Sequence, residues 1–152
     1  MAILFSQLAD ITGGDLEQFH LDQPLSHLQI DSRKWSITSD AVFLAIKGIK
    51  HDGHDFIEIA YESGIRQFII NKGFKFDPVV LEKCNVLAVP DTLKALQVIT
   101  AYHRDQFNLK VIAINGSNGK TIVKEWLSQI LSRNFKVVKS PKSFNSRIGV
   151  PL

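Results

Sequence analysis

Cysteine, glycine and proline are scarce in this sequence, and long apolar runs are missing from it. The single cysteine among the 152 residues, Cys84, cannot form an internal disulfide and is compatible with a reducing cytosol. No run reaches the roughly 18 apolar residues that a membrane-spanning helix requires. Nine glycines and five prolines are too few for a collagen-like chain. We therefore expect a globular, cytoplasmic protein without a membrane span.

The sequence also lacks a large excess of positive or negative charge. There are 18 Lys and Arg residues against 15 Asp and Glu residues, and no basic run occurs. A mixed solvated surface explains this balance better than a nucleic-acid interface does, so we expect no nucleic-acid partner. The start of the chain, MAILFSQLAD, lacks a basic region and soon reaches Asp10, so it is not a secretory signal. A hydrophobic fraction of 45% excludes general disorder, because it provides enough apolar surface to offset chain entropy.

Short apolar runs alternate with stretches of helical periodicity, which is typical of an α/β protein. Asp55 is a candidate N-cap for a helix at 56–63, with Gly64 just past its end, and Asp91 is a candidate N-cap for a longer helix. Strands are expected at 15–21, 41–46, 67–70, 86–89, 110–114 and 136–139, and helices at 3–9, 56–63, 92–107 and 120–131.

We expect a domain boundary near residue 108, after the connecting helix at 92–107. Residues 1–108 then form a small N-terminal α/β domain. Residues 109–152 hold only a strand, a glycine-rich loop, a helix and a strand. A doubly wound sheet needs more strands than these to cover its faces. We therefore interpret residues 109–152 as the truncated start of a P-loop ATPase-like domain, and the chain as the front of a longer protein.

The strongest chemical signal is a loop between an expected strand and an expected helix. It consists of Gly116, Ser117, Asn118, Gly119, Lys120 and Thr121. The glycines allow backbone N–H groups to approach phosphate oxygens, and the helix N-terminus adds partial positive charge. Lys120, the candidate catalytic residue, supplies a full charge for the phosphates of ATP, and Thr121 supplies a hydroxyl for Mg²⁺. The full P-loop pattern has a glycine where Ile114 stands, and the alternative is a glycine-rich turn with an incidental lysine.

Two other groups of residues carry weaker signals. Residues 51–55 contain two histidines and two aspartates, but two histidines three apart on a loop are a weak zinc signal. A turn at Gly53 and a helix cap at Asp55 explain them better. Nothing in the sequence places a base beside Cys84, so we interpret it as a small, semi-buried residue and not as a nucleophile.

Three stretches resemble the Mur ligases. The loop with its two preceding residues, INGSNGKT, resembles the ATP loop of that family, which also lacks the early glycine. Asp31-Ser32-Arg33, followed by DAVFLAIK at 40–47 and DGHDFI at 52–57, resembles the family's N-terminal domain. The final SFNSRIGVPL resembles a segment of the D-alanyl-D-alanine-adding member. The resemblance covers nearly the whole chain in order.

The sequence departs from the family pattern at four positions. Asn115 replaces the usual threonine before the loop. Ser143 and Ser146 stand where two asparagines are common, and Arg147 stands at a usually acidic position. The last three concern substrate contacts and leave the ATP loop intact.

The resemblance implies a three-domain ligase that uses ATP and Mg²⁺. Its substrates would be UDP-N-acetylmuramoyl-tripeptide and D-alanyl-D-alanine, which are joined through an acyl phosphate in peptidoglycan precursor synthesis. Residues 1–108 would hold the UDP-linked substrate. The acidic Mg²⁺ ligand, the modified lysine and the third domain would lie beyond Leu152, so this chain alone would be inactive. The stretch KSPKSFNSRIGVPL most resembles versions fused to an alanine racemase.

The resemblance also implies that Asp31, Ser32, Arg33 and Asn145 bind substrate. Ser32 would hydrogen-bond the nucleotide, and Arg33 would pair with a phosphate. A turn capped by Asp31 and a structural ion pair of Arg33 explain the same residues equally well. For the whole chain, a non-catalytic P-loop nucleotide-binding module is the alternative function.

Overall fold

The computed structural model describes residues 3–30, 40–48, 51–75, 77–141 and 146–151. The chain divides into a first unit, Met1–Gln106, and a second unit, Phe107–Leu152. The first unit contains α1 (Gln7–Thr12), β1 (Asp15–Gln18), β2 (His27–Gln29), β3 (Ala41–Leu44), the 3₁₀ turn η1 (Gly53–Phe56), α2 (Ile57–Glu62), β4 (Gln67–Asn71), α3 (Pro78–Leu81), β5 (Asn85–Val89) and α4 (Thr92–Asp105). The second unit contains α5 (Lys120–Leu131).

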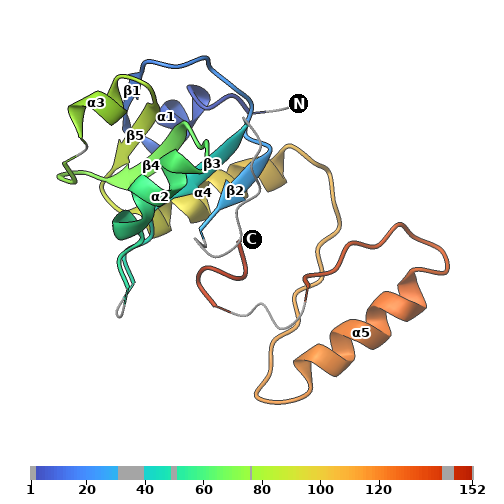
Figure 1. Cartoon of the computed structure of the whole chain (residues 1–152). Coiled ribbons are helices and arrows are strands. Elements are labelled where there is room, and N and C mark those ends of the chain that lie inside the picture. Colours follow the sequence, from blue (N-terminus) through green and yellow to red (C-terminus); the bar gives the residue numbers. More distant parts are fainter. Residues whose placement is uncertain (1–2, 31–39, 49–50, 76, 142–145, 152) are drawn as a thin grey trace. The chain divides into compact units, whose positions relative to one another are not determined.

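A five-stranded sheet with the order β1-β5-β4-β3-β2 forms the centre of the first unit (Figure 1). Strands β2 to β5 run parallel, and β1 joins the edge antiparallel to β5. Nearly every residue of β3, β4 and β5 is buried. Strands that are covered on both faces have no polar alternation, which is why they stand out in the sequence as short apolar runs. The predicted α/β class is confirmed.

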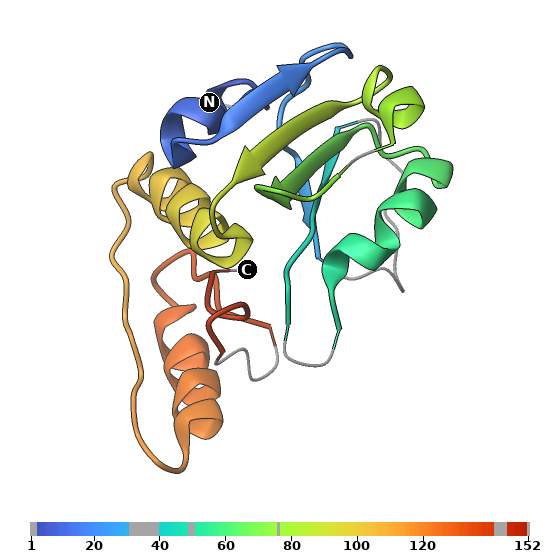
Figure 2. The same ribbon diagram turned by 90° about the vertical axis from the view of Figure 1, so that its left-hand side faces the viewer.

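Helices cover both faces of this sheet. Figure 2 shows α1 and α4 on one side and α2 on the other. On the α2 side, the rings of Phe43 and Phe68 meet edge to face with centroids 6.4 Å apart. On the opposite side, Leu8 of α1 and Leu96 and Ile99 of α4 are buried. The apolar stripes of these helices therefore complete a core on each face.

Two of the predicted helix ends are confirmed. The side chain of Asp91 accepts a hydrogen bond from the backbone N–H of Lys94 at 3.1 Å, so it caps α4. Gly64 follows α2 with a φ of 100°, and its N–H donates to the carbonyl of Tyr61. Glycine adopts this left-handed conformation without a steric penalty, so it ends the helix as expected.

The predicted N-cap at Asp55 is wrong, because the turn η1 precedes α2 and moves the cap to Asp52. The carboxylate of Asp52 accepts from the backbone N–H of His54 at 3.0 Å and lies 2.5 Å from its ring Nδ1. A side chain at Gly53 would not fit, because its Cβ would lie 2.6 Å from the backbone nitrogen of Ile46. The DGH sequence is therefore required by local packing.

His54 connects this turn to two other elements. Its Nε2 accepts the backbone N–H of Asn71 at 3.0 Å, so the ring proton resides on Nδ1 and points at Asp52. The side-chain oxygen of Asn71 accepts the N–H of Thr92, the first residue of α4. This chain of hydrogen bonds, from Asp52 to Thr92, ties the turn before α2 to the end of β4 and the start of α4.

Two element boundaries differ from the prediction near the N-terminus. The helix expected at 3–9 begins only at Gln7, because the preceding residues pair with a distant segment: Phe5 donates to Gln23, and Ser6 bonds to Asp22. The strand expected at 15–21 ends at Gln18. Beyond it, the side chain of Asn85 takes the backbone N–H groups of residues 19 and 20.

In the second unit the helix expected at 120–131 is confirmed as α5, but residues 110–114 and 136–139 form no strand. Residues 110–114 have the composition of a buried strand. A strand needs neighbours that pair with its N–H and C=O groups, and the described part of the chain provides none for them. Several apolar side chains of this unit are correspondingly exposed: Val111, Ile112, Ile122, Trp126, Ile130, Phe135 and Val138.

The revised cap gives a first prediction. Asp52→Ala should lower the free energy of unfolding by about 1–2 kcal/mol, because it removes a helix cap and the ring partner of His54. Asp55→Ala is the matched control and should change it by less than about 0.5 kcal/mol, because Asp55 is exposed and caps nothing. Urea unfolding of the two variants measures the difference. Equal destabilisation would contradict the assignment of the cap.

The same carboxylate predicts a pH dependence. Burial opposes the effect, but hydrogen bonds from the backbone and ring of His54 hold the pKa of Asp52 below its usual range. A group with a depressed folded-state pKa stabilises the fold above its unfolded-state pKa, near 3.9, and this contribution is lost as the pH falls through the folded-state value. Wild type should therefore lose more stability below about pH 4 than Asp52→Ala. If the free energy of unfolding fell equally in the two proteins as the pH was lowered, Asp52 would not have this stabilising role.

Hydrogen exchange should separate the two units. Amides of β3, β4 and β5 should exchange slowly, because they are hydrogen-bonded and buried. Amides at 107–119 should exchange at least about 100-fold faster, because this segment has no ladder partner among the described residues. Mass spectrometry of the 152-residue chain measures both segments in one experiment. Comparable protection would contradict the structure of the second unit.

Candidate functional site

The loop at 116–121 enters α5 through a left-handed glycine. Gly119 has a φ of 77° and occupies the N-cap position, where no side chain caps the helix. The first N–H groups of a helix have no partner within it, and they point out of its N-terminal end. The carbonyl of Gly119 accepts from Val123, which starts the helical ladder. This geometry presents donors and the positive end of the helix dipole to an anion.

The side chain of Lys120 folds back over this loop. Its ammonium donates to the carbonyl of Gly116 and lies 3.4 Å from the carbonyl of Ser117. The backbone N–H of Gly116 donates to the side-chain oxygen of Asn115 at 2.9 Å. The positive charge of Lys120 is therefore held at the mouth of the loop. Asn115 was not predicted as part of the site, although an asparagine before a glycine is a common turn signal.

Ser117, Asn118 and Thr121 have exposed side chains in the same loop and in the first turn of α5. The Thr121 hydroxyl is a suitable oxygen ligand for Mg²⁺. Among the residues that the structure describes, no group of three or more His, Cys, Asp or Glu side chains could hold a metal ion. The Thr121 hydroxyl and the loop at 116–121 thus lie together at the start of α5.

Two residues of the second turn of α5 contact the chain that follows the helix. Lys124 donates to the carbonyl of Ser140 at 2.9 Å, and Glu125 pairs with Lys139. The hydrogen bond from Lys139 holds the pKa of the Glu125 carboxyl below its usual range. These contacts, which the sequence alone did not predict, keep residues 139–140 beside the helix that carries the loop.

The four predicted substrate residues, Asp31, Ser32, Arg33 and Asn145, lie outside the described residues. The weaker candidates can be judged. Both ring nitrogens of His54 are already engaged, one with Asp52 and one with the N–H of residue 71, so this ring is structural.

Cys84 is buried in the first unit. Its burial raises the pKa of the thiol to about 11, with a smaller opposing effect from Arg66. The thiol is therefore protonated at neutral pH and is a poor nucleophile.

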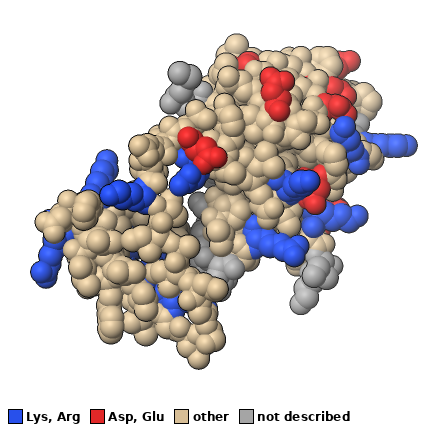
Figure 3. Space-filling model, turned by 180° about the vertical axis from the view of Figure 1, so that it is seen from behind, with Lys and Arg blue, Asp and Glu red and all other residues tan. Residues whose placement is uncertain are grey.

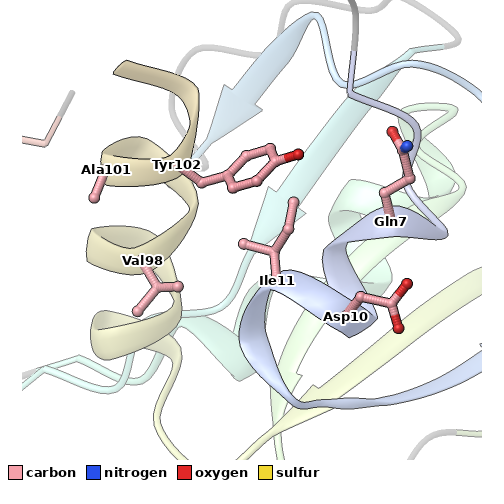
Figure 4. A pocket seen from close by; sticks show the side chains of 6 residues that line it. All are labelled: Gln7, Asp10, Ile11, Val98, Ala101 and Tyr102. Atoms are coloured by element: carbon pink, nitrogen blue, oxygen red, sulfur yellow. The ribbon is translucent and has the colours of Figure 1, made fainter. Parts of the chain in front are cut away.

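A shallow groove of about 560 Å³ lies between α1 and α4 in the first unit. Figure 4 shows Tyr102 and Val98 of α4 facing Ile11 and Gln7 of α1 across it. Its lining is mainly apolar, and Asp10 provides its one carboxylate. No predicted site residue lines this groove.

The surface charge is mixed. On the face shown in Figure 3, basic side chains are separated by uncharged surface and by acidic side chains. Among the described residues, no helix is long and apolar enough to cross a membrane.

Comparisons with known proteins show which family this chain resembles. The model of the Mur ligase family, catalytic domain, matches residues 24–134. The UDP-N-acetylmuramoyl-tripeptide--D-alanyl-D-alanine ligase of Bacillus subtilis (strain 168) is 32% identical over 95% of this chain and 31% of its own length. The enzyme of the same name from Escherichia coli (strain K12) is 33% identical over 100% of this chain and 31% of its own length.

Solved structures of proteins named MurF are also similar to this chain. A crystal structure of MurF from Acinetobacter baumannii matches 99% of this chain and 32% of its own, with a TM-score of 0.83 and 32% identity. MurF ligase from Thermotoga maritima, solved in complex with ADP, matches 84% of this chain and 28% of its own, with a TM-score of 0.70 and 27% identity. The chain thus spans about a third of the length of these relatives. Since the family model matches more than half of the sequence, the chain belongs to the Mur ligase family.

Proposed function

We propose that the chain is the N-terminal part of an ATP-dependent ligase that adds D-alanyl-D-alanine to UDP-N-acetylmuramoyl-tripeptide. The reaction belongs to the cytoplasmic synthesis of peptidoglycan precursors. The observation that carries the proposal is the left-handed Gly119 before an uncapped helix, with the ammonium of Lys120 at the mouth of the loop. The names of the curated relatives support the choice of substrates.

In this proposal the two parts of the chain have separate tasks. Residues 1–108 bind the UDP-linked substrate, through Asp31, Ser32 and Arg33. Residues 109–152 begin the ATP-binding domain, with Asn145 in its substrate segment. The resemblance of these stretches to the family supports this division.

The loop residues bind and orient the triphosphate of ATP. Backbone N–H groups at 116–121 donate to phosphate oxygens, and Lys120 neutralises charge on the β- and γ-phosphates. The Thr121 hydroxyl would hold Mg²⁺, which supplies further charge neutralisation when it is bound. These groups fix the γ-phosphate for attack by the substrate carboxylate, and positioning of this kind removes much of the barrier.

The proposed ligation has two steps. A carboxylate oxygen of the tripeptide attacks the γ-phosphorus, the bond to the β-phosphate oxygen breaks, and ADP leaves. The amine of D-alanyl-D-alanine then attacks the acyl carbon, loses a proton and expels inorganic phosphate. Lys120 acts in the first step, in which negative charge shifts among the oxygens that it contacts.

A finer proposal concerns the whole protein. The stretch KSPKSFNSRIGVPL supports a version of the ligase that is fused to an alanine racemase. Sequencing the reading frame beyond codon 152 tests this directly. A racemase domain after the ligase domains supports the fusion, and a reading frame that ends with the ligase contradicts it.

The role of Lys120 predicts a large kinetic effect. In the full-length protein, Lys120→Ala should lower kcat by about 100- to 1,000-fold at saturating ATP, because a contact to transferring charge is typically worth about 3–4 kcal/mol. Steady-state assay of phosphate release with both substrates measures the loss.

Lys136→Ala is the matched control for this experiment. It removes the same charge from an exposed position outside the loop, so its kcat should stay within about twofold of wild type. If Lys120→Ala turned over ATP as fast as Lys136→Ala, Lys120 would have no catalytic role.

A further inference from the structure

Gln67 is an unexpected side chain at the centre of the sheet. It is the first residue of β4, the middle strand of the five, and it is 0% exposed. Among the described residues, it is the only one whose side-chain oxygen and nitrogen are both buried without a hydrogen-bond partner. A buried amide that makes no hydrogen bond is costly, and native proteins nearly always provide it with a partner.

The sheet register shows where this side chain lies. Gln67 pairs with Val42 of β3 and Asn85 of β5, so the three side chains project from the same face of the sheet. The next residue, Phe68, belongs to the core cluster on the α2 side. Gln67 therefore points to the opposite face, on which α1 and α4 lie (Figure 2).

The neighbouring Asn85 makes this part of the core polar. Its Oδ1 accepts the backbone N–H groups of Phe19 and His20, at 3.2 and 2.8 Å. Its Nδ2 donates to the carbonyl of Leu21 at 3.2 Å, which uses one of its two hydrogens. A second hydrogen of Asn85 and the whole amide of Gln67 are thus available on one face of two adjacent strands.

We propose that Gln67 and Asn85 form a buried hydration site that holds an ordered water between β4 and β5. The water accepts hydrogen bonds from the Nδ2 of Asn85 and the Nε2 of Gln67 and donates one to the Oε1 of Gln67. Buried waters typically make about three hydrogen bonds to polar groups that would otherwise be unpaired, and these two amides provide that number. An anion or a metal ion fits less well, because both side chains are neutral and no carboxylate pairs with them in the register.

The experiment is nuclear magnetic resonance of the 152-residue chain with ¹⁵N labelling. Overhauser peaks between water and the side-chain NH₂ protons of Gln67 and Asn85 are expected. In the rotating frame their sign is opposite to that of chemical exchange, and in the laboratory frame their sign is that of a long-lived bound water. Absence of such peaks at Gln67, or a Gln67 amide with direct hydrogen-bond couplings to protein atoms, would overturn the proposal.

Variants provide the second measurement. Gln67→Met keeps the length of the side chain and removes its polar atoms, so the water peak at Asn85 should weaken at least twofold, and Tm should not rise. The control, Gln129→Met on an exposed position of α5, makes the same chemical change away from the sheet and should leave that peak unchanged. A Tm of Gln67→Met above that of wild type would show that the amide was dry and unpaired, and would refute the hydration site. If Gln67→Met does not fold, the wild-type peaks alone decide.

Discussion

The fold of the first unit depends on three parallel strands, β3, β4 and β5, that are buried on both faces. Each backbone N–H and C=O group of such a strand must find its partner on a neighbouring strand, because helices on both sides exclude water. The two edge strands provide the outer partners: β2 pairs with β3, and β1 pairs with β5. Side-chain hydrogen bonds also anchor the loops at the ends of the central strands. The chain of hydrogen bonds from Asp52 through His54 and Asn71 to Thr92 fixes one such end.

The second unit shows what happens when the same requirement is not met. Residues 110–114 are as apolar as a central strand, yet they form no strand, and Val111 and Ile112 are exposed. The helix α5 forms nevertheless, because a helix satisfies its backbone groups within one segment. Its large apolar side chains Trp126 and Ile130 are exposed. A helix can thus form from one segment alone, whereas a strand needs a partner segment.

This difference explains how much of the structure the sequence could predict. The apolar runs of the buried strands, the cap at Asp91 and the turn at Gly64 can each be recognised within one short segment of the sequence, and these predictions were correct. Asp55 was predicted as a cap because a 3₁₀ turn before a helix leaves no separate periodicity. The helix expected at 3–9 began late because residues 22–25 compete for its first backbone groups. The hydration site at Gln67 had no sequence signal beyond a polar residue in an apolar run.

The start of α5 was predictable for the same reason, since the loop and the first helical residues lie within six consecutive residues. The structure adds the position of the Lys120 side chain. Its ammonium donates to the carbonyls of Gly116 and Ser117, so the charge of the side chain is partly compensated. In the proposed function, binding of a phosphate would exchange two neutral acceptors for an anionic one. Charge-assisted hydrogen bonds are roughly twice as strong as neutral ones, so the exchange favours the nucleotide. The loop carbonyls keep the lysine close to its working position, and little side-chain entropy is lost when the phosphate replaces them.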